Sequence, residues 1–148
     1  MSQLGVLDTT LQKTHEWLRD IKKELGFDND RAAYAALRAT LHGLRDLLGT
    51  DQVARLGAQF PMLVRGIYYE GWNPPPIATA RPSRNGFFDS IRHELREHHE
   101  LQNTERVARI VFGVIATHLT AGEIEHIVPS LPREVRALWP QPTVKNAE

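Results

Sequence analysis

Apolar residues recur at intervals of three and four along most of this chain of 148 residues. Near the N-terminus they include Leu11, Leu18, Ile21 and Leu25. This spacing places side chains on one face of an amphipathic helix, whereas strict alternation would indicate a strand. The pattern predicts an all-α fold with helices over residues 8–25, 30–48, 51–59, 61–69, 86–97, 104–119, 121–128 and 132–138.

Residues with strong preferences for helix ends agree with these boundaries. Thr120 and Glu123 have the spacing of a capping box, in which each side chain accepts a hydrogen bond from the other residue's backbone N–H. Pro61 and Pro132 suit first helical positions, and Gly26 lies where the first helix should end. The sequence therefore predicts both the helices and their termini.

An internal repeat connects the two halves of the chain. At an offset of 71 residues, apolar residues coincide and Pro61 falls on Pro132; upstream, the offset becomes 70. The coinciding pairs are Leu41 and Phe112, Leu48 and Leu119, Val53 and Ile124, Leu56 and Ile127, Val64 and Val135, and Ile67 and Leu138. We expect two diverged tandem copies of a short helical unit, packed as one helical bundle-like domain.

The predicted boundaries divide the chain into four parts. Repeat 1 covers about residues 8–69 and repeat 2 about residues 86–139. Between them lies a connector over residues 70–85, whose prolines exclude helix and favour an extended backbone. We expect the tail over residues 140–148 to be frayed.

Charge and composition exclude several classes of function. Residues 1–73 and residues 74–148 each contain nine basic and nine acidic residues, so neither half has the basic excess typical of nucleic-acid binding. No apolar run is long enough to span a membrane, and the N-terminus does not have the form of a signal peptide. The lack of cysteine fits a reducing compartment. We therefore expect a cytoplasmic protein without membrane contact.

Three segments together resemble a known family. They are residues 36–46 (ALRATLHGLRD), residues 58–74 (AQFPMLVRGIYYEGWNP) and residues 131–140 (LPREVRALWP). The chain is similar, over nearly its whole length, to the bacterial family known as domain of unknown function 2267. The resemblance implies a duplicated helical fold, and it supplies no activity, substrate, cofactor or catalytic residue.

Glu123 and His126 are the candidates for metal binding. Their spacing is the Glu-x-x-His element that dimetal helical bundles use twice. Repeat 1 has Gln52 and Arg55 at the equivalent positions, so the second element is missing, and helix capping explains Glu123 equally well. His93 and His98 are five residues apart, a spacing that does not suit a shared ion on one helix face. We predict no cofactor.

Arginine and aromatic residues near the end of each repeat are candidates for partner binding, because these residue types are enriched at protein interfaces. The candidates are Arg65 and Tyr69 in repeat 1, Trp72 just after it, and Arg133 and Arg136 in repeat 2. The alternative is a structural role, in which the neighbouring Tyr68 and Trp139 fill the two ends of the core.

No phosphate-binding loop, nucleophile elbow or paired-aspartate motif is present, which favours a non-catalytic role. We expect a helical module that acts through self-association or a protein partner. The first alternative is a small-ligand or metal-binding protein or enzyme with its site between the repeats. The second is a weak nucleic-acid binder.

Overall fold

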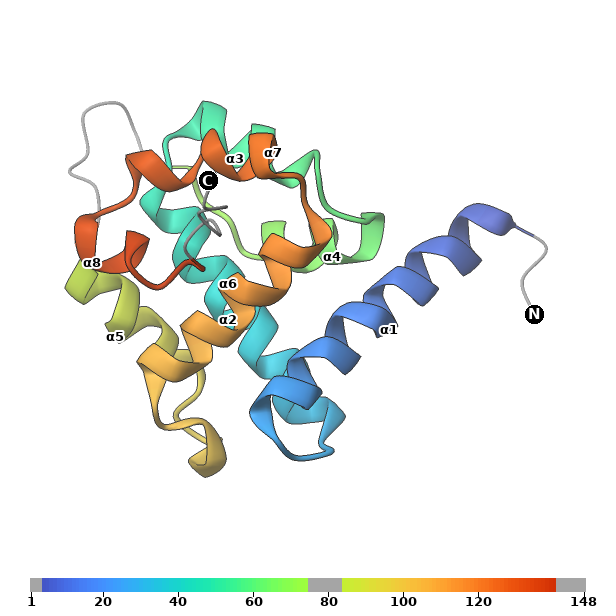
Figure 1. Ribbon diagram of the computed structural model, residues 1–148, viewed down its shortest axis with the longest axis horizontal. Coiled ribbons are helices and arrows are strands. Elements are labelled where there is room, and N and C mark those ends of the chain that lie inside the picture. Colours follow the sequence, from blue (N-terminus) through green and yellow to red (C-terminus); the bar gives the residue numbers. More distant parts are fainter. Residues whose placement is uncertain (1–3, 75–83, 141–148) are drawn as a thin grey trace, which may run out of the picture.

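The computed structural model describes residues 4–74 and 84–140, and every regular element in these ranges is helical, which confirms the all-α prediction (Figure 1). The elements are α1 (Gly5–Leu25), α2 (Asp30–Leu47), α3 (Thr50–Gly57), α4 (Met62–Tyr69), α5 (Arg84–Glu94), η1 (His99–Leu101), α6 (Thr104–His118), α7 (Ala121–Glu125), η2 (Val128–Ser130) and α8 (Arg133–Arg136). Most of the predicted connector and tail lies outside the described residues.

Two boundaries differ from the prediction for identifiable reasons. The first helix begins at Gly5 rather than at residue 8, because the helical spacing of apolar side chains extends back from Leu11 to Leu7. The predicted helix 121–128 ends at Glu125, and a 3₁₀ turn, η2, follows it. Pro129 has no backbone N–H with which to continue an α-helix there.

The predicted capping box is present at the start of α7. Glu123 Oε1 accepts from the Thr120 N–H at 2.8 Å, and Thr120 Oγ1 accepts from the Glu123 N–H at 3.2 Å. Gly26 ends α1 in the left-handed conformation, with φ 89°. Pro61 and Pro132 lie immediately before the first residues of α4 and α8, whereas the sequence predicted them to be the first helical residues themselves.

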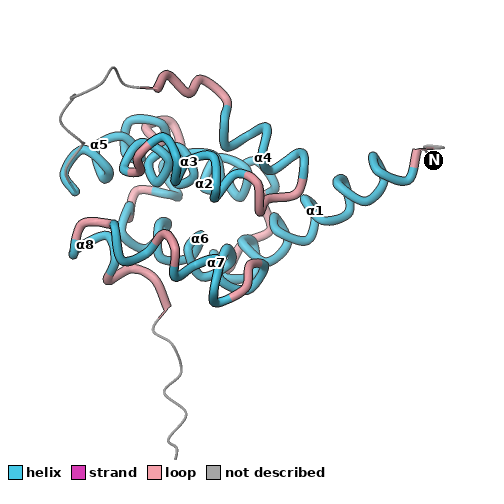
Figure 2. Tube along the Cα trace, turned by 90° about the horizontal axis from the view of Figure 1, so that it is seen from above, coloured by secondary structure: helices cyan, strands magenta, loops and turns pink. Residues whose placement is uncertain are grey.

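Helix α2 lies at the centre of the fold and packs against α1, α4, α5 and α6. Its apolar side chains join those of the other helices in one core cluster. Gly43 allows a close approach to α5, since a Cβ at this position would lie 3.0 Å from Cδ1 of Phe87. Figure 2 shows α2, α3 and α4 in one layer and α6, α7 and α8 in another.

The two ends of α1 have different surroundings. Trp17, Ile21 and Leu25 are buried, and the Trp17 ring stacks on His118 of α6 with 4.9 Å between centroids. The N-terminal part extends away from the other helices (Figures 1 and 2). Its first buried side chain is that of Thr10. No helix in the described residues combines the length and the apolar character needed to cross a membrane.

Candidate functional site

The partner-binding candidates lie at two separate places. Arg65, Tyr69 and Trp72 belong to α4 and the turn after it, whereas Arg133 and Arg136 belong to α8. Figures 1 and 2 both place α4 and α8 at different ends of the molecule. The five residues therefore do not form one continuous surface.

Arg65 and Arg136 bind backbone carbonyls of the turn that precedes their own helix. Arg65 donates from Nε to the Gly57 carbonyl and from Nη2 to the Phe60 carbonyl, both at 3.0 Å. Arg136 Nη1 donates to the Pro129 carbonyl at 3.4 Å. Both arginines thus stabilise turns within the chain.

The aromatic candidates form a row that leads from the core to the surface. Tyr68 is fully buried, its hydroxyl donates to the Val53 carbonyl at 2.9 Å, and burial raises the pKa of this hydroxyl well above its usual range. Tyr69 packs against Tyr68 at 4.9 Å and against Trp72 at 5.6 Å. In the second half, Trp139 is buried and stacks on Phe112 at 4.3 Å.

We expect Gly57→Ala to lower the free energy of unfolding by about 2 kcal/mol, because the new Cβ would lie 2.6 Å from the Tyr69 hydroxyl oxygen. The ring of Tyr69 cannot easily move, since Tyr68 and Trp72 hold it on both sides. Urea denaturation measures the change. Gly66→Ala is the matched control, because no atom lies within 4 Å of its added Cβ. Equal stability of the two variants would contradict the packing described for Tyr69.

Glu123 and His126 both have partners within the chain. Glu123 closes the capping box, and Nδ1 of His126 lies 3.2 Å from Nη1 of Arg55. Because a guanidinium only donates, this His126 nitrogen acts as the acceptor. Within the described residues, no group of three or more His, Cys, Asp or Glu side chains is placed to hold a metal ion.

A buried polar network that the sequence reasoning missed joins α2 to α4 and α5. His42 is 4% exposed, with Nε2 at 2.8 Å from the Ile67 carbonyl oxygen and Nδ1 at 3.0 Å from Glu94 Oε2. The carbonyl only accepts, so Nε2 carries the hydrogen of this contact. His42 thereby joins α2 to α4 through Nε2 and to α5 through Nδ1.

Arginines of α2 extend this network on both sides of His42. Arg45 is 6% exposed, and its Nη1 donates to the Tyr68 carbonyl at 3.0 Å and to the Glu70 carbonyl at 2.9 Å. Arg38 binds the carboxylates of Glu70 and Glu94 at 2.8 and 2.9 Å. The hydrogen bond from Arg38 lowers the pKa of the Glu70 carboxyl. The signal in the sequence was the i, i+4, i+7 spacing of Arg38, His42 and Arg45, which places three polar side chains on one side of a helix rich in Ala and Leu.

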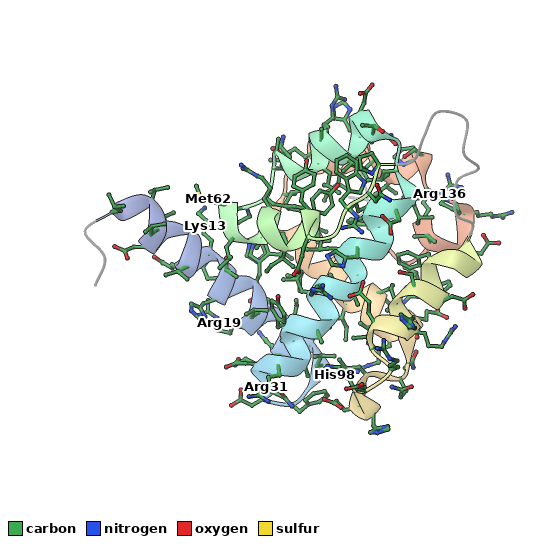
Figure 3. The ribbon with its side chains drawn as sticks, turned by 180° about the vertical axis from the view of Figure 1, so that it is seen from behind. Lys13, Arg19, Arg31, Met62, His98 and Arg136 are labelled. Atoms are coloured by element: carbon green, nitrogen blue, oxygen red, sulfur yellow. The ribbon has the colours of Figure 1, made fainter. Side chains whose placement is uncertain are left out.

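Beside this network, a groove of about 700 Å³ opens between α1, α2 and the end of α5. We call it the Tyr34 groove, and its lining residues are Leu18, Asp30, Arg31, Tyr34, Ala35, Arg38, Glu94 and His98. It lies between the two predicted repeats, where the ligand-binding alternative places a site. Figure 3 shows Arg31 and His98 at the same end of the molecule, away from Met62 and Lys13.

A second groove, of about 520 Å³, separates α1 from α4, with Lys13 and Arg65 among its lining residues. Two of its lining residues, Val6 and Met62, belong to a group of large apolar side chains around the start of α1 and the start of α4 that are each 40% to 60% exposed. We call this group the α1–α4 apolar surface, and its members are Leu4, Val6, Leu7, Leu11, Met62 and Leu63. The Leu63 N–H donates to Thr10 Oγ1 at 2.8 Å, which fixes the start of α4 against α1.

Comparison with known proteins identifies a family without supplying a mechanism. A family model described as an uncharacterized conserved protein (DUF2267) matches residues 14–138. No curated protein matches the chain. The matched residues include the buried network and the Tyr34 groove, whereas Leu7 and Leu11 come before them.

Proposed function

Because the chain belongs to the DUF2267 family, whose description names no activity, we propose from its structure that it acts as a self-association module. In this proposal, two copies of the chain bind each other through the α1–α4 apolar surface. The family model begins at residue 14, so the proposal concerns this chain rather than the family as a whole.

The concentration of exposed apolar side chains on one surface carries the proposal. Of the seven large hydrophobic side chains that are exposed in the described ranges, six belong to the α1–α4 apolar surface. Single exposed hydrophobic residues are ordinary, but a concentration of them at the start of two neighbouring helices favours a site of association. The seventh, Tyr34, belongs to α2 and lines the Tyr34 groove.

The geometry of α1 favours a second copy as the occupant. On an ideal helix, Leu7, Leu11 and Leu18 point within about 40° of one another, so they form one stripe. The stripe is exposed at Leu7 and Leu11, where α1 extends from the body (Figure 1), and partly covered at Leu18. Two such extending segments can lie side by side about a two-fold axis, and the interface then uses the same surface on both copies.

The charges beside the stripe favour an antiparallel pair. Asp8 precedes His15 and Arg19 on the same flank of α1, within about 40° on an ideal helix. In an antiparallel pair, Asp8 of one copy faces the basic residues of the other. A parallel pair would instead bring like charges together. Exposed pairs of this kind contribute only about 0.2–1 kcal/mol each, so they set the orientation and the apolar contacts supply most of the affinity.

The size of the surface suits a reversible dimer. The exposed parts of its six side chains amount to about three complete apolar side chains per copy. An interface of this kind lies at the small end of stable interfaces, which bury about 800 Å² per partner. We therefore expect a dissociation constant of about micromolar order.

Of the five predicted partner-binding residues, Arg65 lines the groove between α1 and α4 and belongs to the proposed contact. In this proposal Tyr69, Trp72 and Arg136 have structural roles, and Arg133 lies outside the contact. The lack of cysteine supports the cytoplasm as the place of action.

The proposal includes an origin from two diverged copies of one helical unit. In most of the pairs at the offset of 71 residues, both members are buried: Leu41 and Phe112, Leu48 and Leu119, Leu56 and Ile127, Val64 and Val135, and Ile67 and Leu138. Arg65 and Arg136, which also coincide, both bind carbonyls of the turn before their helix. These correspondences support a duplicated unit whose copies pack together.

Sedimentation velocity of the full chain over a series of concentrations tests the self-association. We expect a monomer–dimer equilibrium for the wild type. In the double variant Leu7→Asp/Leu11→Asp, the dissociation constant should rise by at least about tenfold, because four carboxylates would enter the dimer interface. Monomer stability should be unchanged, since both side chains are exposed.

Tyr34→Asp is the matched control, because it places a charge on an exposed hydrophobic residue outside the α1–α4 apolar surface. This variant should dimerise as the wild type does. A wild type that stays monomeric at every concentration would contradict the proposal, as would a double variant that dimerises unchanged. In those cases binding to a different protein would become the better hypothesis. If the chain instead bound a nucleic acid with an affinity that falls steeply as salt rises, nucleic-acid binding would become the better hypothesis.

A further inference from the structure

The Tyr34 groove combines an apolar floor with an exposed aromatic wall. Leu18 and Ala35 are partly buried and pack against the core, so they form the floor. Tyr34 beside them is 42% exposed, which leaves much of its side chain open to solvent. An open aromatic side chain next to an apolar floor offers a stacking surface for another planar ring.

Each carboxylate that lines the groove already has partners within the chain. Asp30 shares Lys22 with Asp28, at 2.8 and 2.9 Å, and Glu94 binds Arg38 through Oε1 at 2.9 Å and His42 through Oε2 at 3.0 Å. These contacts engage both oxygens of Glu94 and one oxygen of Asp30. They also hold Glu94 in place as the rear wall of the groove.

Donors, in contrast, remain open on the same groove. Arg31 is exposed and makes no hydrogen bond or ion pair with any other described residue. His98 has one charged neighbour, with its Nδ1 at 3.7 Å from Glu100 Oε2, a distance too long for a hydrogen bond. Figure 3 shows Arg31 and His98 at the same end of the molecule. The unused polar groups at the mouth are therefore suited to an anion.

We infer that the Tyr34 groove binds a small planar ring that carries one anionic group, either a carboxylate or a phosphate. The ring stacks on Tyr34 above Leu18 and Ala35, and the anionic group binds Arg31, with His98 as a second donor. The residues that line this groove are not members of the α1–α4 apolar surface, so binding and self-association can fail separately.

Titration of the ¹⁵N-labelled full chain, observed by NMR, tests the inference. The probes are phenyl phosphate and benzoate, which present the two anions on the same ring. At least one of them should shift the amide signals of residues 31–35 and 98 saturably. Arg31→Gln and Tyr34→Leu should each weaken this binding by at least about fivefold, because one removes the anion's partner and the other the stacking surface.

Arg133→Gln is the matched control, since Arg133 is an exposed arginine on α8 and does not line the groove. It should leave the binding unchanged. Inorganic phosphate and phenol separate the two parts of the site, and each should bind more weakly than the combined probes. The inference is overturned if neither ring-bearing probe shifts these signals saturably, if Arg31→Gln binds as tightly as the wild type, or if either part alone binds as well as the whole.

Discussion

Trp17→Ala should lower the free energy of unfolding by about 4 kcal/mol, the largest effect that we expect from a single substitution. Trp17 is 1% exposed, its ring stacks on His118 at 4.9 Å, and it meets Phe60 edge-on at 5.6 Å. Its removal leaves a cavity where α1 meets α6 and the turn before α4. The melting temperature should fall by about 10 °C, and urea denaturation followed by circular dichroism measures the free energy directly.

The same substitution should also weaken self-association, because Trp17 anchors the helix that carries Leu7 and Leu11. Gln12→Ala is the control on the same helix, since this side chain is exposed and its loss should change the free energy of unfolding by less than about 0.5 kcal/mol. Similar stability losses in both variants would mean that α1 is not anchored through Trp17.

Arg45→Met should lower the free energy of unfolding by about 3 kcal/mol. Methionine retains the apolar contacts of the methylene groups of Arg45. The buried carbonyl of Tyr68 and the partly buried carbonyl of Glu70, however, lose their hydrogen-bond donor. The C-terminus of α4 should loosen as a consequence. The amide of Trp72, which donates to the Tyr69 carbonyl at 2.9 Å, should therefore exchange its hydrogen faster.

Arg92→Met provides the comparison for this effect. Arg92 forms an ion pair with Asp89 at 2.8 Å, but both side chains are more than half exposed. Such pairs contribute about 0.5 kcal/mol, so this variant should be nearly as stable as the wild type. If Arg45→Met were as mild as Arg92→Met, the carbonyls at the end of α4 would not depend on Arg45.

The helices were largely predictable because local chemistry determines them. The three- and four-residue spacing located every α-helix, and the capping box placed the start of α7 at the predicted residue. The prediction that residues 121–128 form one helix was wrong at its end. Periodicity alone did not take into account the missing N–H of Pro129.

The sites were much less predictable because they depend on how the helices meet. The apolar stripe of α1 has the same spacing at Leu11 and Leu18, yet one side chain extends into solvent and the other packs against the core. Nothing in the periodicity separates these two outcomes. His42 stands between apolar residues in the sequence, and only the packing of α4 and α5 shows that both its nitrogens have acceptors.

The most direct test of the proposed function is an intermolecular distance. Since the chain has no cysteine, Gln12→Cys introduces a unique site for a spin label on the exposed part of α1, next to Leu11 in the chain. In the dimer, pulsed electron resonance should report a short distance between labels, set by an interhelical separation of about 8–10 Å plus the two label arms. A label at Arg136→Cys, at the opposite end of the molecule (Figure 3), should report a much longer one. No dipolar coupling at Gln12→Cys, or a shorter distance at Arg136→Cys, would contradict self-association through the α1–α4 apolar surface.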